Sequence, residues 1–202
     1  MAVKNIVFDV GNVLVKWDPV SIIQKTFPEI SDPSEFLQSI YKNNVWYDLN
    51  LGKISELEAI EHYHQKLNIE KASLIRLLTI TKESLTPLEE TLLIVKKLHQ
   101  AQFPLYIITD NINEFMSYLR QRYTFWDMFL GVVVSAEIGH LKPSPHIYRY
   151  LLDTYKLKPE ETVFFDDLKD NVEGAKAVNM QSFQFVGAEQ CIKDLAKLKI
   201  LV

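Results

Sequence analysis

Short runs of apolar residues alternate along the chain with segments of helical periodicity. The runs are continuous in their apolar character, and they lie at residues 5–8, 105–108, 132–134, 163–165 and 183–186. Continuous apolar runs of this length are typical of strands buried on both faces, as in a parallel sheet covered by helices. The pattern therefore predicts an α/β fold with a doubly wound, Rossmann-like parallel sheet.

Helix-start signals lie between several of these runs. The stretch from Thr86 to Glu89 offers a cap, a proline at the first helical position and a reciprocal glutamate, and apolar residues at helical spacing follow it as far as Leu98. Ser144 and Asp170 are predicted to cap two further helices. Strands that alternate with such helices support the same fold class.

One long stretch interrupts the alternation. Between residues 17 and about 85 no run is typical of a strand, and Asp32 and Ser55 each open a helix-start motif. We expect roughly four helices there, placed between the first strand and the helix that leads to the second. The sequence therefore predicts an α/β core of residues 1–15 and 86–202 that carries an all-helical insert of residues 16–85.

Composition and charge exclude several classes of protein. The 202 residues are 48% hydrophobic and 24% charged, which is ordinary for a globular protein and excludes disorder. The single Cys191 excludes an internal disulfide and gives no indication of a cysteine zinc site. A net charge of −4 offers no basic field for nucleic acid, and no run is long enough to cross a membrane. Without a secretory signal, a cytoplasmic location is expected, and no protein partner is evident.

Polar side chains follow the predicted strands at one edge of the sheet. Asp9 follows the first strand, Thr109–Asn111 the second, and Asp166 and Asp167 a later one, while Lys142 lies in a nearby loop. Parallel strands present their carboxyl ends at the same edge, where ligands bind in this fold class. Converging carboxylates repel one another, and a hard divalent cation relieves that conflict. The sequence therefore predicts a Mg²⁺ site at this edge.

These residues resemble the motifs of the haloacid dehalogenase superfamily of hydrolases. Four motifs, at residues 6–14, 107–111, 142–148 and 163–171, occur in the family's order and span nearly the whole chain. The insert is similar to the four-helix cap of one subclass. Residues 46–56 within it are similar to small bacterial phosphatases that act on glucose 1-phosphate and related sugar phosphates.

The resemblance implies a nucleophile and a metal site. Asp9 would attack phosphorus and form an aspartyl-phosphate, which water would then hydrolyse. Mg²⁺ would be held by the Asp9 carboxylate, the Gly11 backbone carbonyl and Asp167, with Asp166 beside it. The implied function is the Mg²⁺-dependent hydrolysis of a small phosphorylated metabolite, a sugar phosphate in particular.

The resemblance also implies how the substrate is held. The Thr109 hydroxyl, the Asp110 N–H and the neighbouring Asn111 would bind the phosphate, and Lys142 would bring a positive charge to the same oxygens. Asn171 stands where many members of the family keep a second acid.

The chain departs from the family pattern at Gly11. Most phosphatases of the family carry there an aspartate that protonates the leaving group, and a positioned acid contributes about 10²–10⁴-fold. An anomeric sugar phosphate, which leaves as a comparatively stable oxyanion, would need this acid less. Asp18, Asp48 and His64 are weak candidates for a substitute.

Two aromatic residues of the insert have two possible placements. Trp46 and Tyr47 are predicted either to line a sugar pocket or to pack within the insert.

A metal-free 2-haloacid dehalogenase is the second possible function. It would use the same nucleophile and is compatible with Gly11. It would leave the acidic pair at 166–167 without a partner, and no arginine precedes Arg76 to clamp a carboxylate. A regulatory module without turnover is the third possibility. Neither the exact substrate nor the oligomeric state follows from the sequence.

Overall fold

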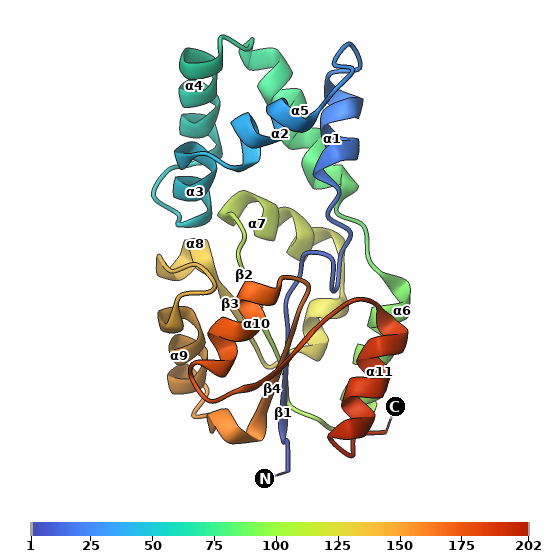
Figure 1. Ribbon diagram of the computed structural model, residues 1–202. Helices are drawn as coiled ribbons and strands as arrows, with labels where there is room; N and C mark the ends of the chain where they lie inside the picture. The colour runs from blue at the N-terminus through green and yellow to red at the C-terminus, as the bar shows by residue number, and fades with distance from the viewer. Residues whose placement is uncertain (1, 202) are drawn as a thin grey trace.

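A parallel sheet of five strands forms the centre of the computed structural model, which describes residues 2–201 (Figure 1). The strands are β1 (Asn5–Phe8), β2 (Leu105–Thr109), β3 (Gly131–Val134), β4 (Thr162–Asp166) and β5 (Gln181–Gln184). Their order across the sheet is β3-β2-β1-β4-β5, and every neighbouring pair is parallel. The chain builds outward from β1 in one direction and then continues on its other side, so the predicted doubly wound fold is confirmed.

Helices cover both faces of this sheet. Helices α6 (Glu89–Gln100), α7 (Asn113–Arg122) and α11 (Ala188–Lys197) lie on one face, and α9 (Pro145–Thr154) and α10 (Lys169–Lys176) on the other. Three short helices lie in the connections: η1 (Phe125–Met128), α8 (Ser135–Ile138) and η2 (Pro159–Glu161). Successive strand residues point to opposite faces, so Ile107 packs in one apolar cluster and Ile108 in the other.

Five helices occupy the stretch between β1 and α6. They are α1 (Pro19–Thr26), α2 (Ser34–Tyr41), α3 (Asn44–Asn50), α4 (Glu56–Leu67) and α5 (Lys71–Ser84). They pack against one another beyond one end of the sheet (Figure 1). The prediction of four helices was therefore one too few. The additional helix arises because the Asn43 side chain accepts hydrogen bonds from Val45 N–H at 2.7 Å and Trp46 N–H at 3.2 Å, and so begins α3 directly after α2.

Two paired segments connect these helices to the sheet. The Lys16 N–H donates to the Thr86 carbonyl, and the Leu88 N–H donates to the Leu14 carbonyl, each at 2.8 Å. The predicted helix cap at Thr86 was therefore wrong. Helix α6 begins only at Glu89, because residues 86–88 pair with residues 14–16, the segment that leads from β1 to α1.

Other local predictions had mixed outcomes. Ser55 forms a complete capping box at α4, and Ser144 caps α9, as predicted. Asp170 lies in the first turn of α10 and does not cap it. The last strand lies at Gln181–Gln184, two residues before the apolar run, because pairing with β4 decides its position at the edge of the sheet.

The division into a core and an insert remains a prediction, whose outermost residues 1 and 202 lie outside the described part of the chain. One apolar cluster includes Phe8 of the sheet as well as Ile22 and Leu77 of the inserted helices. The insert therefore packs against the rest of the protein through buried side chains. Within residues 2–201, no helix combines the length and the apolar character needed to span a membrane.

Candidate active site

Two acidic residues that are distant in the sequence meet at the carboxyl ends of β1 and β4. The parallel register pairs Phe8 with Phe165, so Asp9 and Asp166 follow side by side. The Asp9 N–H donates to the Phe165 carbonyl at 2.9 Å. Asp9 is 7% exposed and Asp166 is 0% exposed. Buried carboxylates this close together require a positive charge or several hydrogen-bond donors nearby.

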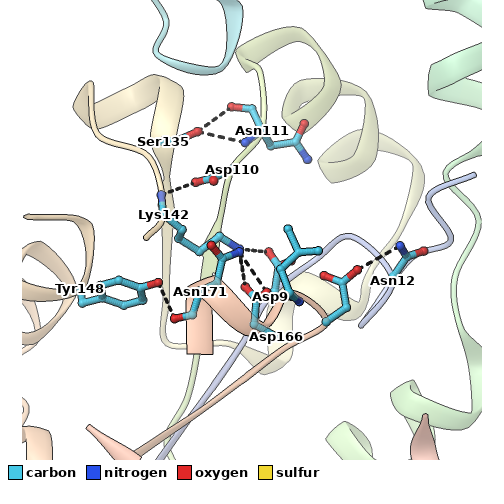
Figure 2. A network of polar contacts seen from close by, with 11 residues as sticks. Asp9, Asn12, Asp110, Asn111, Ser135, Lys142, Tyr148, Asp166 and Asn171 are labelled. Carbon is cyan, nitrogen blue, oxygen red and sulfur yellow. Dashed lines mark hydrogen bonds and ion pairs between the residues drawn. The ribbon is translucent and has the colours of Figure 1, made fainter. Parts of the chain in front are cut away.

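A single lysine supplies that positive charge (Figure 2). Lys142 Nζ lies 2.7 Å from Asp9 Oδ1 and 2.7 Å from Asp166 Oδ2, and the lysine is itself buried. Burial alone would lower the pKa of Lys142, but the carboxylates of Asp9, Asp166 and Asp110 outweigh it and hold the pKa above its usual value. Burial raises the pKa of Asp9 to about 7, against the lowering effect of Lys142. The ammonium group therefore stays charged between the two acids.

Asp166 is fully engaged by donors from its own surroundings. Besides Lys142, its oxygens accept from the Leu168 N–H at 2.8 Å and from Asn171 Nδ2 at 3.0 and 3.1 Å. The hydroxyl of the buried Tyr148 donates to the Asn171 carbonyl at 2.8 Å, which fixes the start of α10 (Figure 2). Sequence analysis placed Asp166 beside a metal. That role stays a prediction; the structure shows that the carboxylate of Asp166 holds the side chains of Lys142 and Asn171.

Asp167 and Gly11 line a cavity beside Asp9, and each carries an oxygen that could ligate a cation. Carboxylate oxygens of Asp9, Asp166 and Asp167 all lie within 4.8 Å of one another. Backbone donors in the turn after β1 go to the carbonyls of Val10 and Val15, so the Gly11 carbonyl has no such partner among residues 2–201. Burial raises the pKa of Asp167. Hard oxygen donors on one side of a cavity fit Mg²⁺.

Asn12 orients Asp167, and sequence analysis did not single it out. Its Nδ2 donates to Asp167 Oδ2 at 3.1 Å, and its Oδ1 accepts from the Trp17 N–H at 3.0 Å. Its backbone has a φ of 54°, in the left-handed region that asparagine tolerates. The Gly11–Asn12 pair is a common turn dipeptide and was the signal available in the sequence. Asn12 thus connects the acidic cluster to the segment that enters α1.

The loop after β2 contributes backbone and amide groups. Asp110 and Asn111 line the cavity, whereas Thr109 is 1% exposed and is not among the lining residues. Asp110 Oδ1 accepts from the Lys142 N–H at 3.0 Å, and burial raises the pKa of Asp110 to about 6. Ser135, which sequence analysis missed, holds Asn111 by accepting from its N–H at 3.0 Å and donating to its carbonyl at 3.3 Å. This loop is therefore fixed to α8 and to the lysine loop.

A cavity of about 510 Å³ lies between this acidic floor and the inserted helices. Its size is within the range of about 300–1,000 Å³ that is typical of sites for small organic molecules. Trp46 and Tyr47 line it, and Trp46 also packs against the apolar cluster that includes the inserted helices, so both predicted placements apply to Trp46. Asp18, Asp48 and His64 are not among the lining residues and make local contacts elsewhere: a helix cap, an ion pair and a backbone hydrogen bond. None of the three candidate substitute acids therefore faces the cavity.

The absence of a carboxylate at Gly11 does not result from crowding. A Cβ atom added at this glycine would meet only Trp17 Cβ, at 3.9 Å, which is an ordinary contact. Gly11 lines the cavity two residues after Asp9. A Cβ atom is therefore accommodated at this position of the cavity wall.

The sheet order, the acids at the ends of β1 and β4, and the buried lysine together define a class of hydrolase. The sequence model of the haloacid dehalogenase-like hydrolases matches residues 3–179, and the chain belongs to this family. The protein is therefore an enzyme, and the family resemblance seen in its four motifs is confirmed.

Individual relatives within this family are distant in sequence. The chain is 24% identical over 195 residues to the sesquiterpene phosphatase astK of Aspergillus oryzae, covering 96% of each protein. It is 25% identical over 194 residues to the D-ribitol-5-phosphate phosphatase of Bacteroides thetaiotaomicron, covering 90% of this chain and 91% of that protein. Some other curated relatives are longer, and the chain spans 36% or less of their length.

A solved structure shares the fold. The family enzyme bt-2542 of Bacteroides thetaiotaomicron, in complex with magnesium and inorganic phosphate, superposes with a TM-score of 0.75. The two chains are 18% identical, and the superposition covers 90% of this chain and 93% of the other. At this identity the likeness establishes a common fold and nothing about the chemistry of the present site.

Proposed function

We propose that this enzyme hydrolyses a small phosphomonoester, with Asp9 as the nucleophile and Mg²⁺ as the cofactor. The observation that carries the proposal is the buried Asp9 carboxylate, paired with Lys142 at 2.7 Å and next to Asp167 at the floor of the cavity. A phosphoryl group brings negative charge to this floor, and a fixed ammonium and a divalent cation offset that charge.

The reaction proceeds in two displacements at phosphorus. A carboxylate oxygen of Asp9 forms a bond to phosphorus as the bond from phosphorus to the leaving oxygen breaks, and the leaving oxygen takes a proton from water. A second water then attacks phosphorus as the bond from the Asp9 oxygen to phosphorus breaks, which restores the Asp9 carboxylate. A proton of this water neutralises the hydroxide that the first water left, and inorganic phosphate leaves. Lys142 stabilises the charge on the phosphoryl oxygens throughout, while Asp166 and Asn171 keep the lysine in position.

The residues that would hold Mg²⁺ are Asp9, Asp167 and the Gly11 backbone carbonyl. When bound, the cation offsets the charge between the anionic nucleophile and the anionic substrate. The donor set supports this assignment because it consists of hard oxygen atoms, and because the oxygens of Asp166 already accept four hydrogen bonds or ion contacts. Asn12 would keep the Asp167 carboxylate in place.

Phosphate oxygens are proposed to bind at the loop after β2. The Asp110 backbone N–H and the Thr109 hydroxyl are assigned to them by the family motif, and the position of Asp110 and Asn111 in the cavity wall supports a contact there. The inserted helices of residues 16–85 would act as a cap that excludes water from the α/β core of residues 1–15 and 86–202. We retain the cytoplasmic location as part of this proposal.

The organic part of the substrate is less constrained by family membership. The motif resemblance suggests a sugar phosphate, and Trp46 and Tyr47 in the cavity wall are compatible with packing against sugar C–H groups. The two relatives matched over most of their length are a sesquiterpene phosphatase and a D-ribitol-5-phosphate phosphatase. The substrates in these two names differ in the polarity of their organic part, so the relatives do not indicate whether a polar or an apolar group fits this cavity.

Dehalogenation of a 2-haloacid is the competing reaction. It is metal-free, so Lys142, the cation that lines this cavity within residues 2–201, would have to offset a substrate carboxylate as well as the carboxylates of Asp9 and Asp166, whereas a phosphoryl group would also meet Mg²⁺. A phosphate-release assay over small phosphomonoesters, with and without Mg²⁺, should be run beside a chloride-release assay with 2-haloacids. We expect Mg²⁺-dependent phosphate release that Asp9→Asn abolishes. Metal-free chloride release, with no phosphate release from any ester, would refute the proposal.

A further inference from the structure

We infer that the substrate is a phosphomonoester with an apolar, uncharged organic part, an inference that rests on the phosphatase function proposed above. The cavity is divided between a polar floor, made by the residues at the strand ends, and a wall that is almost entirely apolar. The floor is suited to one phosphate group, and the wall determines what else the site accepts.

The wall derives from five separate parts of the chain. Val15 and Leu85 come from the two paired connecting segments, Trp46 from α3, Phe115 from α7 and Leu168 from the loop after β4. Side chains from both the sheet core and the inserted helices therefore present apolar groups to the same space. Such a wall favours apolar ligands, because burying their surface releases it from water.

Aromatic contacts make part of this wall rigid. Trp17 and Trp46 stack with ring centroids 6.0 Å apart and planes 17° apart, and Tyr41 meets both rings edge-on, at 5.3 and 4.9 Å. Phe115 lies 6.2 Å from the Trp46 ring. Because these rings are fixed by one another, the cavity is formed before a ligand enters, and little ordering is needed on binding.

Few groups on the wall are available to hydroxyl groups of a substrate. The wall offers Asn50, the Tyr47 hydroxyl and the indole N–H groups of the two tryptophans, and the Asn50 amide already donates to the Trp46 carbonyl at 2.8 Å. A sugar carries several hydroxyls, and each one that leaves water without a new partner weakens binding. A second anionic group would fare worse, since Lys142 is the cation that lines the cavity within the described residues.

An exposed leucine extends the apolar wall outward. Leu168 is 57% exposed although it lines the cavity, and it directly follows the acidic pair at the end of β4. An apolar ligand that covers an exposed apolar side chain at the edge of a cavity removes both surfaces from water, which favours binding. Leu168 also permits a substitution with little risk to folding, because most of its surface is not packed.

The experiment measures binding without the leaving-group chemistry that Gly11 complicates. Alkylphosphonates, which cannot be hydrolysed, should be tested in Mg²⁺ from methyl- to hexylphosphonate, by inhibition of phosphate release and by protection against thermal unfolding. We expect the inhibition constant to fall by about two- to fourfold for each added methylene, as the burial of a CH₂ group predicts. Glucose 1-phosphate should bind more weakly than cyclohexylphosphonate.

Two matched variants locate the effect in the wall. Leu168→Asn should weaken hexylphosphonate binding by about three- to tenfold, in proportion to the part of the side chain that the ligand covers, and methylphosphonate binding by less. Leu93→Asn is the control, because Leu93 is 59% exposed on α6 and does not line the cavity. It should leave the whole series unchanged.

The outcomes separate the two proposals. Phosphate release combined with inhibition that does not depend on chain length, or with tighter binding of glucose 1-phosphate, overturns the apolar substrate and leaves the phosphatase. Thermal protection that rises with chain length, in a protein that releases no phosphate, overturns the phosphatase and leaves the apolar site. An equal loss in Leu168→Asn and Leu93→Asn would also overturn the assignment of the wall.

Discussion

Gly52 sets the contact between the inserted helices and the sheet core, and an alanine there should loosen the active site. Gly52 lies between α3 and α4 with a φ of +67°, and an added Cβ would stand 2.1 Å from the Ala136 carbonyl oxygen. Ala136 belongs to α8, which leads into the loop of Lys142. The substitution therefore displaces the segment that leads to Lys142, the inserted helices, or both.

Two terms contribute to the expected effect. Alanine in the left-handed region costs about 1–2 kcal/mol of folding free energy. In addition, the Cβ–oxygen separation must grow from 2.1 Å to at least 3.0 Å, so one of the two segments has to move by about 1 Å. A displacement of this size near reacting groups can cost on the order of 10²-fold in rate. We expect kcat/KM for phosphate release to fall by about 10- to 100-fold.

A second glycine offers a matched control. Gly139 has a φ of +71°, and an added Cβ would meet nothing within 4 Å. Gly139→Ala therefore carries the same backbone strain without the collision, and should lose a similar 1–2 kcal/mol, in urea unfolding, while keeping kcat/KM within about twofold. Equal losses of activity in the two variants, or full activity in Gly52→Ala, would show that the contact between Gly52 and Ala136 does not position the active site.

Three further substitutions test individual parts of the site. Gly11→Asp should raise turnover of esters with poor leaving groups by at least about tenfold, because it adds a proton donor that the chain lacks at a position where a Cβ makes only an ordinary contact; lower turnover in a kinetic screen of leaving groups would contradict this. Asn12→Gly keeps the left-handed backbone and removes the contact with Asp167, so the Mg²⁺ concentration for half-maximal activity should rise about 10- to 100-fold, and an unchanged value would count against the assignment. Asp166→Asn breaks a buried ion pair and should cost about 3–5 kcal/mol in urea unfolding, whereas Glu189→Gln, which breaks an exposed pair, should leave the unfolding midpoint unchanged; similar losses in both would show that burial is not decisive.

The strands and the acids at their ends could be predicted from the sequence, because both depend on local signals and a general rule. The apolar runs identify the central strands, and parallel strands bring Asp9 and Asp166 to one edge of the sheet. Prediction failed where tertiary pairing overrides a local signal. Thr86 begins a good helix-start motif, yet its carbonyl accepts a hydrogen bond from Lys16 in the segment after β1. The strand at Gln181–Gln184 takes its position from pairing with β4.

The contacts that position the site could not be predicted, because they join loops whose paths the sequence does not reveal. Lys142 was recognised by its motif, but its simultaneous pairing with Asp9 and Asp166 depends on the path of the loop after α8. The bond from Asn12 to Asp167 joins residues 155 positions apart. The apolar wall is likewise assembled from separate segments, so its character appears only once the inserted helices are placed over the sheet.

In the proposed reaction, Asp9 carries the phosphoryl group during turnover. The most direct measurement is rapid acid quenching of the enzyme during turnover of a phosphomonoester, followed by mass spectrometry of the peptide that contains Asp9. We predict one phosphoryl group on Asp9, formed only with Mg²⁺ and absent in Asp9→Asn. Phosphate release at an undiminished rate from Asp9→Asn, or a phosphoryl group found on a different residue, would contradict the account.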